Sequence, residues 1–103
     1  VMTPAAEHAD LVLPCVSYYE DDFDLVPSAE NHYVQLRRRA IEPVGESRND
    51  YQIFAGVCAR LGQAADWVDD PEGWCRHVLR ESTDPAVRGI DWETLKRDGV
   101  VRL

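Results

Sequence analysis

Three consecutive aliphatic residues near the start of the chain, Leu11, Val12 and Leu13, constrain the fold most, and Pro14 follows them directly. An apolar run without alternating polar residues suits a strand that is buried on both faces, as in a parallel sheet. Proline ends such a run because it has no backbone N–H to donate to a neighbouring strand. We therefore predict a buried strand from Ala9 to Pro14, which needs neighbouring strands to cover it.

The segment from Cys15 to His32 has neither strand nor helix periodicity. It contains acidic residues and residues typical of loops, namely Glu20, Asp21, Asp22, Asp24, Pro27, Ser28 and Asn31. We predict a long, acidic, irregular connection. A loop of this length is uncommon in a compact domain unless it has a function or rests on other parts of a larger protein.

A half-exposed strand is predicted from Tyr33 to Ala40, because apolar and polar residues alternate there. Its inner face would carry Val34, Leu36 and Ala40, and its outer face Tyr33, Gln35, Arg37 and Arg39.

A helix is predicted next, from Ser47 to Gly62. Ser47 and Asp50 have the spacing of a capping box, and Gly62 suits the end of a helix. Its buried face would consist of Tyr51, Phe54, Cys58 and Leu61.

A second helix is predicted from Asp70, with Pro71 at its first position. It would place Trp74, Val78 and His77 on one face, although Gly73 weakens it.

A third helix is predicted from Asp91 to Gly99. Ile90 before the cap and Leu95 at the fourth helical position form a hydrophobic staple. Val100 to Leu103 would then be a strand. These elements predict one α+β unit over residues 1–103, with an irregular acidic loop and about three helices.

Composition excludes several classes of protein. The net charge of −8 argues against a nucleic-acid partner, because such binding depends on clustered Lys and Arg. No apolar run approaches the roughly 18 residues of a membrane span. Cys15, Cys58 and Cys75 are widely and irregularly spaced, so we predict reduced thiols that pack as small apolar side chains.

Two groups of residues have the chemistry of metal ligands but not the spacing. Glu20, Asp22 and Asp24 alternate like calcium ligands, yet Leu25 and Val26 follow where a calcium loop needs glycine. A solvated acidic loop is the favoured interpretation. The histidines, at positions 8, 32 and 77, are too scattered for a metal pair. We predict no metal ligand and no catalytic residue in this chain.

Arg37, Arg38 and Arg39 form the one concentration of positive charge. On a strand, Arg37 and Arg39 project to one side and Arg38 to the other. One interpretation is a clamp for the pyrophosphate of a dinucleotide-like cofactor, because guanidinium binds phosphate oxygens in a bidentate fork. The favoured interpretation is pairing with the acidic loop, since no glycine-rich phosphate loop accompanies the run.

Four stretches in order, TPAAEHADLVLP from Thr3, YVQLRRRAIEP from Tyr33, GESRNDYQIF from Gly45 and ARLG from Ala59, resemble molybdopterin oxidoreductases. The resemblance is to the dimethyl sulfoxide reductase superfamily, especially its polysulfide and thiosulfate reductase-like branch. It implies a fragment of a Rossmann-like domain that binds bis(molybdopterin guanine dinucleotide) with molybdenum or tungsten, together with the connection leaving that domain. Val1 precedes Met2, which also suggests a piece of a longer chain.

The resemblance implies that Thr3 contacts the nucleotide part of this cofactor and that Asp10 has a structural role. Arg37 and Arg39 are the further cofactor-binding candidates. AENHYVQ, from Ala29 to Gln35, departs from the N-x-E-G-R-V-Q pattern of many members, so contacts made there by Asn or Arg are not expected.

The parent protein implied by the resemblance is a redox enzyme of a prokaryote, cytoplasmic or periplasmic. The remainder of the polypeptide would be the partner of this chain, with an electron-transfer subunit and an iron–sulfur cluster as further components. The loop from Tyr18 to Asp24 would line the substrate funnel. This chain alone is not expected to be active. The alternative is a small acidic protein-interaction or regulatory module whose surface is anchored by Trp67, Trp74 and Trp92.

Overall fold

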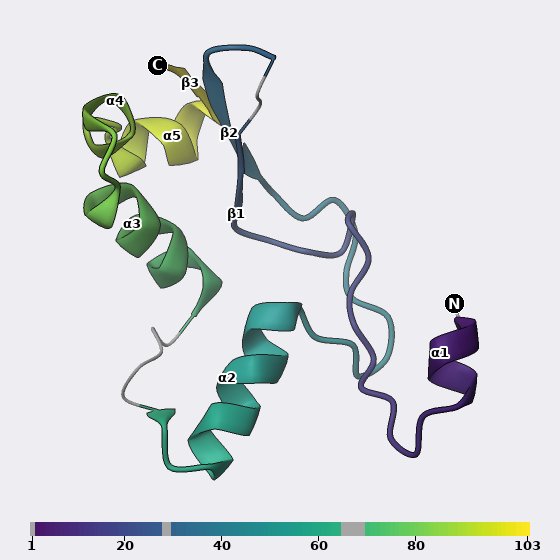
Figure 1. Cartoon of the computed structure of the whole chain (residues 1–103). Coiled ribbons are helices and arrows are strands. Elements are labelled where there is room, and N and C mark those ends of the chain that lie inside the picture. The colour runs from purple at the N-terminus through teal and green to yellow at the C-terminus, as the bar shows by residue number, and fades with distance from the viewer. Residues whose placement is uncertain (1, 28–29, 65–69) are drawn as a thin grey trace.

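The computed structural model describes residues 2–27, 30–64 and 70–103, and within them the chain is α+β (Figure 1). The described strands are β1 (Asp24–Pro27), β2 (Tyr33–Arg37) and β3 (Val100–Arg102). The described helices are α1 (Pro4–Glu7), α2 (Asp50–Arg60), α3 (Pro71–Glu81), α4 (Pro85–Arg88) and α5 (Trp92–Asp98). None of these helices is long and apolar enough to cross a membrane.

The three strands form one antiparallel sheet in the order β1-β2-β3. Leu25 of β1 faces Leu36 of β2, and Val34 faces Val101 of β3. The predicted alternation is confirmed for β2, because Val34 and Leu36 are buried while Tyr33 and Gln35 are exposed. The strand ends at Arg37, earlier than the predicted Ala40, and the backbone N–H of Ala40 donates to Tyr19 instead.

The hydrophobic core lies between this sheet and the C-terminal helices. It consists of Val34, Leu36, Leu79 and Leu95, with Phe23, Leu25, Val87, Ile90, Trp92 and Val101 packed against it. The radius of gyration is 15.9 Å, larger than the about 13 Å of a compact domain of 100 residues. The core therefore organises one end of the chain, and α1 and α2 lie outside it (Figure 1).

The predicted third helix is confirmed as α5. Asp91 caps it by accepting the N–H of Thr94, and Gly99 ends it in the left-handed conformation at φ 73°. Leu95 is fully buried and Ile90 packs against the same core, as the predicted staple requires. The predicted C-terminal strand is confirmed as β3.

The second predicted helix is confirmed as α3, with Asp70 as its cap, but its buried face was predicted wrongly. Cys75 and Leu79 are buried, whereas Trp74 and Val78 are exposed. The two faces differ by one residue, or about 100° of rotation. The Cys75 thiol donates to the backbone oxygen of Phe23 at 3.2 Å, a contact across 52 residues that helps set this rotation.

The structure confirms the predicted position of helix α2 along the chain but not the packing predicted for it. Its capping box is formed by Asn49 and Gln52 rather than by Ser47 and Asp50. The predicted buried face is wrong, because Phe54 is 59% and Leu61 69% exposed. Only part of this apolar face is covered by the described chain: Tyr51 packs against Trp74 of α3 with ring centroids 5.8 Å apart, and Cys58 is half-buried.

The predicted strand from Ala9 to Pro14 does not form. Leu11 is 75%, Val12 44% and Leu13 50% exposed. Pairing in this region is limited, within the described residues, to one parallel bridge between Cys15 and Arg48. A buried parallel strand needs hydrogen-bonded neighbours on its edges and helices on its faces, and the described residues supply no more than that one bridge.

Three described elements were not predicted, namely β1, α1 and α4. β1 has four residues inside the segment predicted to be irregular, which is too short for an alternation to be recognised. α1 and α4 are single turns, each opened by a capping residue and a proline, Thr3 with Pro4 and Asp84 with Pro85. That pair of residues was a readable start signal in both cases.

Glu72 joins α3 to α5 and gives the fold a predictable acid sensitivity. Its Oε1 accepts from Lys96 Nζ at 2.8 Å, Arg76 Nη2 at 2.7 Å and Trp92 Nε1 at 3.2 Å. These contacts, that of Lys96 above all, lower the pKa of Glu72 to about 2. Because the pKa falls on folding, the stabilisation is complete above the unfolded value of about 4.3 and is lost as the pH falls toward 2.

We expect Glu72→Gln to destabilise the fold by about 1 to 3 kcal/mol at pH 7 and to flatten the loss of stability between pH 5 and pH 2. Glu93→Gln is the matched control, because Glu93 is 74% exposed and lies 3.7 Å from Arg76. Denaturant unfolding at a series of pH values measures both. Equal acid sensitivity in Glu72→Gln and the wild type would show that the lowered pKa of Glu72 is not the source of the acid sensitivity.

Candidate functional site

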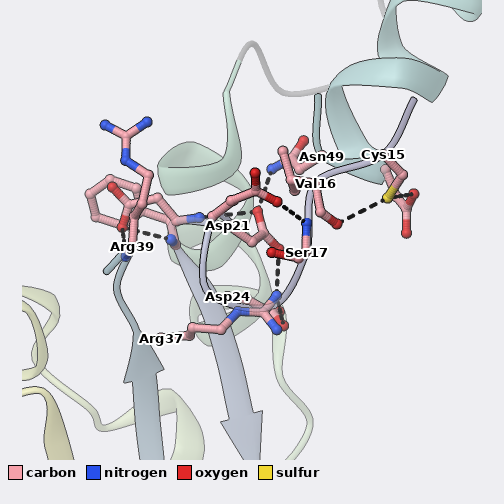
Figure 2. A network of polar contacts seen from close by, with 12 residues as sticks. Cys15, Val16, Ser17, Asp21, Asp24, Arg37, Arg39 and Asn49 are labelled. Carbon is pink, nitrogen blue, oxygen red and sulfur yellow. Dashed lines mark hydrogen bonds and ion pairs between the residues drawn. The ribbon is translucent and has the colours of Figure 1, made fainter. Parts of the chain in front are cut away.

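The acidic loop, the end of β2 and the start of α2 meet around an open cleft of about 410 Å³ (Figure 2). Its lining includes three carboxylates, one guanidinium, four aromatic rings and a thiol, contributed by Asp21, Asp24, Asp50, Arg37, Tyr18, Phe23, Tyr51, Trp74 and Cys15. Negative charge therefore exceeds positive charge in the cleft.

Arg37 is at the centre of this arrangement. Its Nη2 pairs with Asp21 and, at 2.8 Å, with Asp24, and its guanidinium lies 4.6 Å from the centroid of the Tyr18 ring. Asp21 also accepts from Asn49 Nδ2 at 3.1 Å, which ties the loop to the cap of α2. The Nε of Arg37 is buried without an acceptor among the described residues. The predicted pairing of the arginine run with the acidic loop is therefore present.

Asp22 binds the other two arginines of the run, Arg38 and Arg39. Its Oδ1 accepts from Arg38 Nε at 2.8 Å and from the backbone N–H of Arg39 at 3.2 Å. The next residue, Phe23, has a φ of 58°, a left-handed conformation that costs a non-glycine residue roughly 1 kcal/mol. The turn places the Phe23 ring against the core and 4.5 Å below the guanidinium of Arg38.

Glu20 is buried, which corrects the expectation that the acids of this loop are solvated. Its carboxylate accepts the backbone N–H of Ser17 at 2.6 Å and that of Val44 at 2.9 Å. The hydrogen bonds from Ser17, followed by that from Val44, lower the pKa of Glu20. Asp21 and Asp22 are also engaged by arginines, so three acids of the loop act as internal hydrogen-bond acceptors.

The cysteines are free thiols, as predicted. Cys15 Sγ donates to Asp50 Oδ1 at 3.1 Å, and this hydrogen bond raises the pKa of the Cys15 thiol. Burial raises the pKa of Cys75 to about 12. A raised pKa disfavours the thiolate, so neither is activated as a nucleophile or metal ligand. In the described segments, no group of three or more His, Cys, Asp or Glu residues is arranged to hold a metal ion.

The three predicted cofactor-binding residues do not converge. Thr3 caps α1 by accepting the N–H of Ala6 at 3.3 Å, and α1 lies apart from the sheet (Figure 1). Arg37 turns into the cleft, whereas the guanidinium of Arg39 extends away from it (Figure 2). Arg39 has a 3.4 Å pairing with Glu42, which is 83% exposed.

Sequence reasoning missed Asn49 as a member of the cleft, and it named Tyr18 only as the first residue of the loop expected to line the substrate funnel. Asn49 carried a readable signal, because Asn before a helix with Gln three residues later is a capping pair. Tyr18 carried no such signal. Trp92 packs against the core and Trp74 stacks on His77, while Trp67 lies outside the described residues. The surface proposed for the alternative interaction module is therefore not assembled by Trp74 and Trp92.

Residues 1–60 match the family model for molybdopterin oxidoreductases, so the chain belongs to this family. The match runs from α1 to the last residue of α2 and includes the whole acidic loop.

Among curated relatives, dimethyl sulfoxide/trimethylamine N-oxide reductase of Rhodobacter capsulatus is 38% identical over 90 residues, which are 84% of this chain and 11% of that protein. Biotin sulfoxide reductase of Cereibacter sphaeroides is 36% identical over 95 residues, 90% of this chain and 13% of that protein. The probable oxidoreductase YoaE of Bacillus subtilis is 29% identical over 102 residues, 98% of this chain and 15% of that protein. The chain thus spans only about a tenth to a seventh of these relatives.

The predicted membership of the dimethyl sulfoxide reductase superfamily, as a fragment, is confirmed by these matches. Two of the relatives are named for reductases of S-oxides or N-oxides. The narrower placement in the polysulfide and thiosulfate reductase-like branch stays a prediction.

Proposed function

We propose that this chain helps to hold a bis(molybdopterin guanine dinucleotide) cofactor, with molybdenum or tungsten, in a larger oxidoreductase. The observation that carries the proposal is the match of residues 1–60 to the molybdopterin oxidoreductase family. The matched residues include Thr3, Arg37 and Arg39, the three candidates for cofactor contact. They would form part of a Rossmann-like cofactor domain completed by the rest of the polypeptide.

Thr3 and Arg39 have the free hydrogen-bonding capacity that a dinucleotide phosphate or base requires. The Thr3 oxygen accepts from Ala6, but its hydroxyl proton is not used in that contact and the residue is exposed. Among the described residues, the one ion pair of the Arg39 guanidinium is with the exposed carboxylate of Glu42, at 3.4 Å. These two side chains fit a phosphate-bearing group, whose binding site other residues of the polypeptide would complete.

Arg37 does not fit the same role. Its guanidinium is engaged by Asp21 and Asp24, and the cleft around it carries a third carboxylate, Asp50. An anionic pyrophosphate placed there would face three like charges. We therefore assign Arg37 to the architecture of the acidic loop and keep Arg39 as the cationic contact of the cofactor.

When bound, this cofactor supplies two-electron redox chemistry at its metal. By analogy with the sulfoxide and N-oxide reductases among the relatives, we propose an S-oxide or N-oxide as the substrate class of the whole enzyme. The residues of this chain would bind and orient the dinucleotide, and the loop from Tyr18 to Asp24 would line the approach to the metal. Metal ligation, any iron–sulfur cluster and any electron-transfer subunit would belong to other parts of the enzyme.

Substitutions at Thr3 test the proposed contact. In the full-length protein, we expect Thr3→Val to weaken cofactor binding about tenfold, because losing one hydrogen bond to a charged group costs about 1.5 kcal/mol. Valine also removes the helix cap, so Thr3→Asp is needed as a control. Aspartate keeps the cap acceptor, removes the donor and places negative charge near the phosphate.

Metal and guanine nucleotide released per protein molecule measure the occupancy after partial extraction of the cofactor. The expected result is loss in Thr3→Val and Thr3→Asp and normal occupancy in Thr3→Ser. Loss in Thr3→Val with normal occupancy in Thr3→Asp would show that Thr3 acts only as a helix cap, and unchanged occupancy in both would remove it from the cofactor site.

A further inference from the structure

Helices α3, α4 and α5, which lie together at one end of the chain (Figure 1), border an open cavity of about 320 Å³. The described residues that line it are three arginines and three apolar residues, namely Arg76, Arg80, Arg88, Leu79, Ile90 and Trp92, without a carboxylate among them. The chain has 19 acidic and 11 basic residues, so the fold creates here a local excess of positive charge that no run in the sequence shows. A cavity of this size with apolar and charged walls is typical of a small-molecule site.

Arg88, the last residue of α4, is held in place without being neutralised. Its Nε and Nη2 donate to the backbone oxygen of Ser82 at 3.0 and 2.8 Å. A guanidinium has five N–H donors, so three remain for a ligand. Among the described residues, no carboxylate forms an ion pair with Arg88. The residue is exposed, so its charge is available to an anion that enters the cavity.

The other two arginines come from one face of α3, because residues four apart on a helix are neighbours. Arg76 Nη2 pairs with Glu72 at 2.7 Å, and the Arg76 guanidinium lies 5.4 Å from the centroid of the Trp92 ring. Arg80 Nε pairs with Glu81 at 2.8 Å, and the Arg80 side chain is 73% exposed. Exposed pairs of this kind contribute little to stability, so an anion can share or replace them.

The rest of the cavity wall is apolar and belongs to the core. Leu79 is buried, and Ile90 and Trp92 pack against the same core. These side chains are therefore fixed by packing, and they present apolar surface beside the guanidinium groups. A ligand that fits both parts of the wall has an anionic group joined to an apolar body.

We propose that this cavity binds an organic phosphate monoester. Such a group presents three terminal oxygens and close to two negative charges at pH 7, and guanidinium binds phosphate through two parallel N–H donors. Three guanidinium groups around one cavity match it better than they match a carboxylate, which has two oxygens and one charge. The site is separate from the proposed cofactor contacts, because Thr3 and Arg39 do not line it and residues 76–92 lie outside the family match.

Calorimetric titration of the full-length protein with phenyl phosphate tests the proposal. We expect Arg88→Gln to weaken binding at least tenfold, because it removes a charge that no described carboxylate neutralises. Arg97→Gln is the matched control, since Arg97 is 70% exposed, pairs with Asp98 and lies outside the cavity. It should change the affinity less than twofold. Equal affinity in Arg88→Gln and the wild type would overturn the proposal, and so would the absence of saturable binding.

Arg80→Gln keeps the test decisive if Arg88→Gln fails to fold, because Arg88 also bonds the backbone of Ser82. Arg80 is paired only with exposed side chains among the described residues, so its loss should leave the thermal unfolding midpoint unchanged. We expect this variant to bind phenyl phosphate at least threefold more weakly. Binding at the wild-type affinity would remove the α3 arginines from the site and overturn the proposal.

Two further probes identify the chemistry of the anion. Benzoate has the same ring with a carboxylate, and inorganic phosphate has the anionic group without an apolar body. Both should bind at least tenfold more weakly than phenyl phosphate. Equally tight binding of benzoate would overturn the assignment to phosphate. Equally tight binding of inorganic phosphate would show that the apolar wall takes no part, and would overturn the assignment to an organic ester.

Discussion

Replacing Leu95 with alanine is expected to destabilise this chain by about 2 to 5 kcal/mol, the largest effect of any single apolar truncation that we predict. Leu95 is fully buried and packs with Val34, Leu36 and Leu79. The described core is small, so the remaining side chains have little freedom to fill the cavity. A loss of this size is a large part of the stability of a small domain. Denaturant unfolding of the 103-residue chain measures it.

Phe54→Ala is the matched control in the same measurement. The sequence alone predicted a core role for Phe54 with a cost of about 3 to 5 kcal/mol. Its side chain is 59% exposed, so we now expect a change below about 1 kcal/mol. If Phe54→Ala were as damaging as Leu95→Ala, the packing of α2 in this structure would be contradicted.

Arg37→Met is expected to cost about 3 kcal/mol, the second large effect. The Arg37 and Asp21 side chains are only 16% and 18% exposed, so removing the guanidinium leaves Asp21 with an uncompensated, largely buried charge beside Asp24. Methionine keeps most of the aliphatic length of arginine, so the loss comes chiefly from charge and hydrogen bonding.

Arg38→Met is the control for Arg37. Arg38 pairs with Asp22 but is 48% exposed, and such surface pairs contribute about 0 to 1 kcal/mol. Thermal unfolding and cofactor occupancy of both variants should be measured in the full-length protein. Unchanged stability with lost cofactor in Arg37→Met would contradict the architectural role and favour a phosphate contact.

Local signals in the sequence predicted the elements that depend on neighbouring residues. The caps Asp70 and Asp91, the terminating glycines Gly62 and Gly99, and the alternation of Val34 and Leu36 each act within a few residues, and all were confirmed. The buried face of α3 could not be predicted in this way. It depends on Cys75 meeting Phe23 across 52 residues, a contact with no local signature.

The errors at the N-terminal end have a different physical cause. The aliphatic run at Leu11 to Leu13 and the apolar face of α2 are patterned for burial, but the described chain leaves the whole run, and Phe54 and Leu61 of α2, exposed. A sequence pattern indicates that a surface needs a partner, but it does not indicate where that partner lies.

The candidate site could be predicted from the sequence only in part. Pairing of the arginines with the acidic loop follows from charge, whereas burial of Glu20 depends on the backbone of Ser17 and Val44.

The most direct test of the central claim is the composition of the full-length protein that contains this chain. After purification from cells that make molybdopterin, metal analysis and nucleotide release by acid hydrolysis should give close to one molybdenum or tungsten atom and two guanine nucleotides per polypeptide. That ratio is the stoichiometry of a bis(molybdopterin guanine dinucleotide) cofactor. A protein that is folded but contains neither metal nor guanine nucleotide under these conditions would contradict the proposed role of this chain.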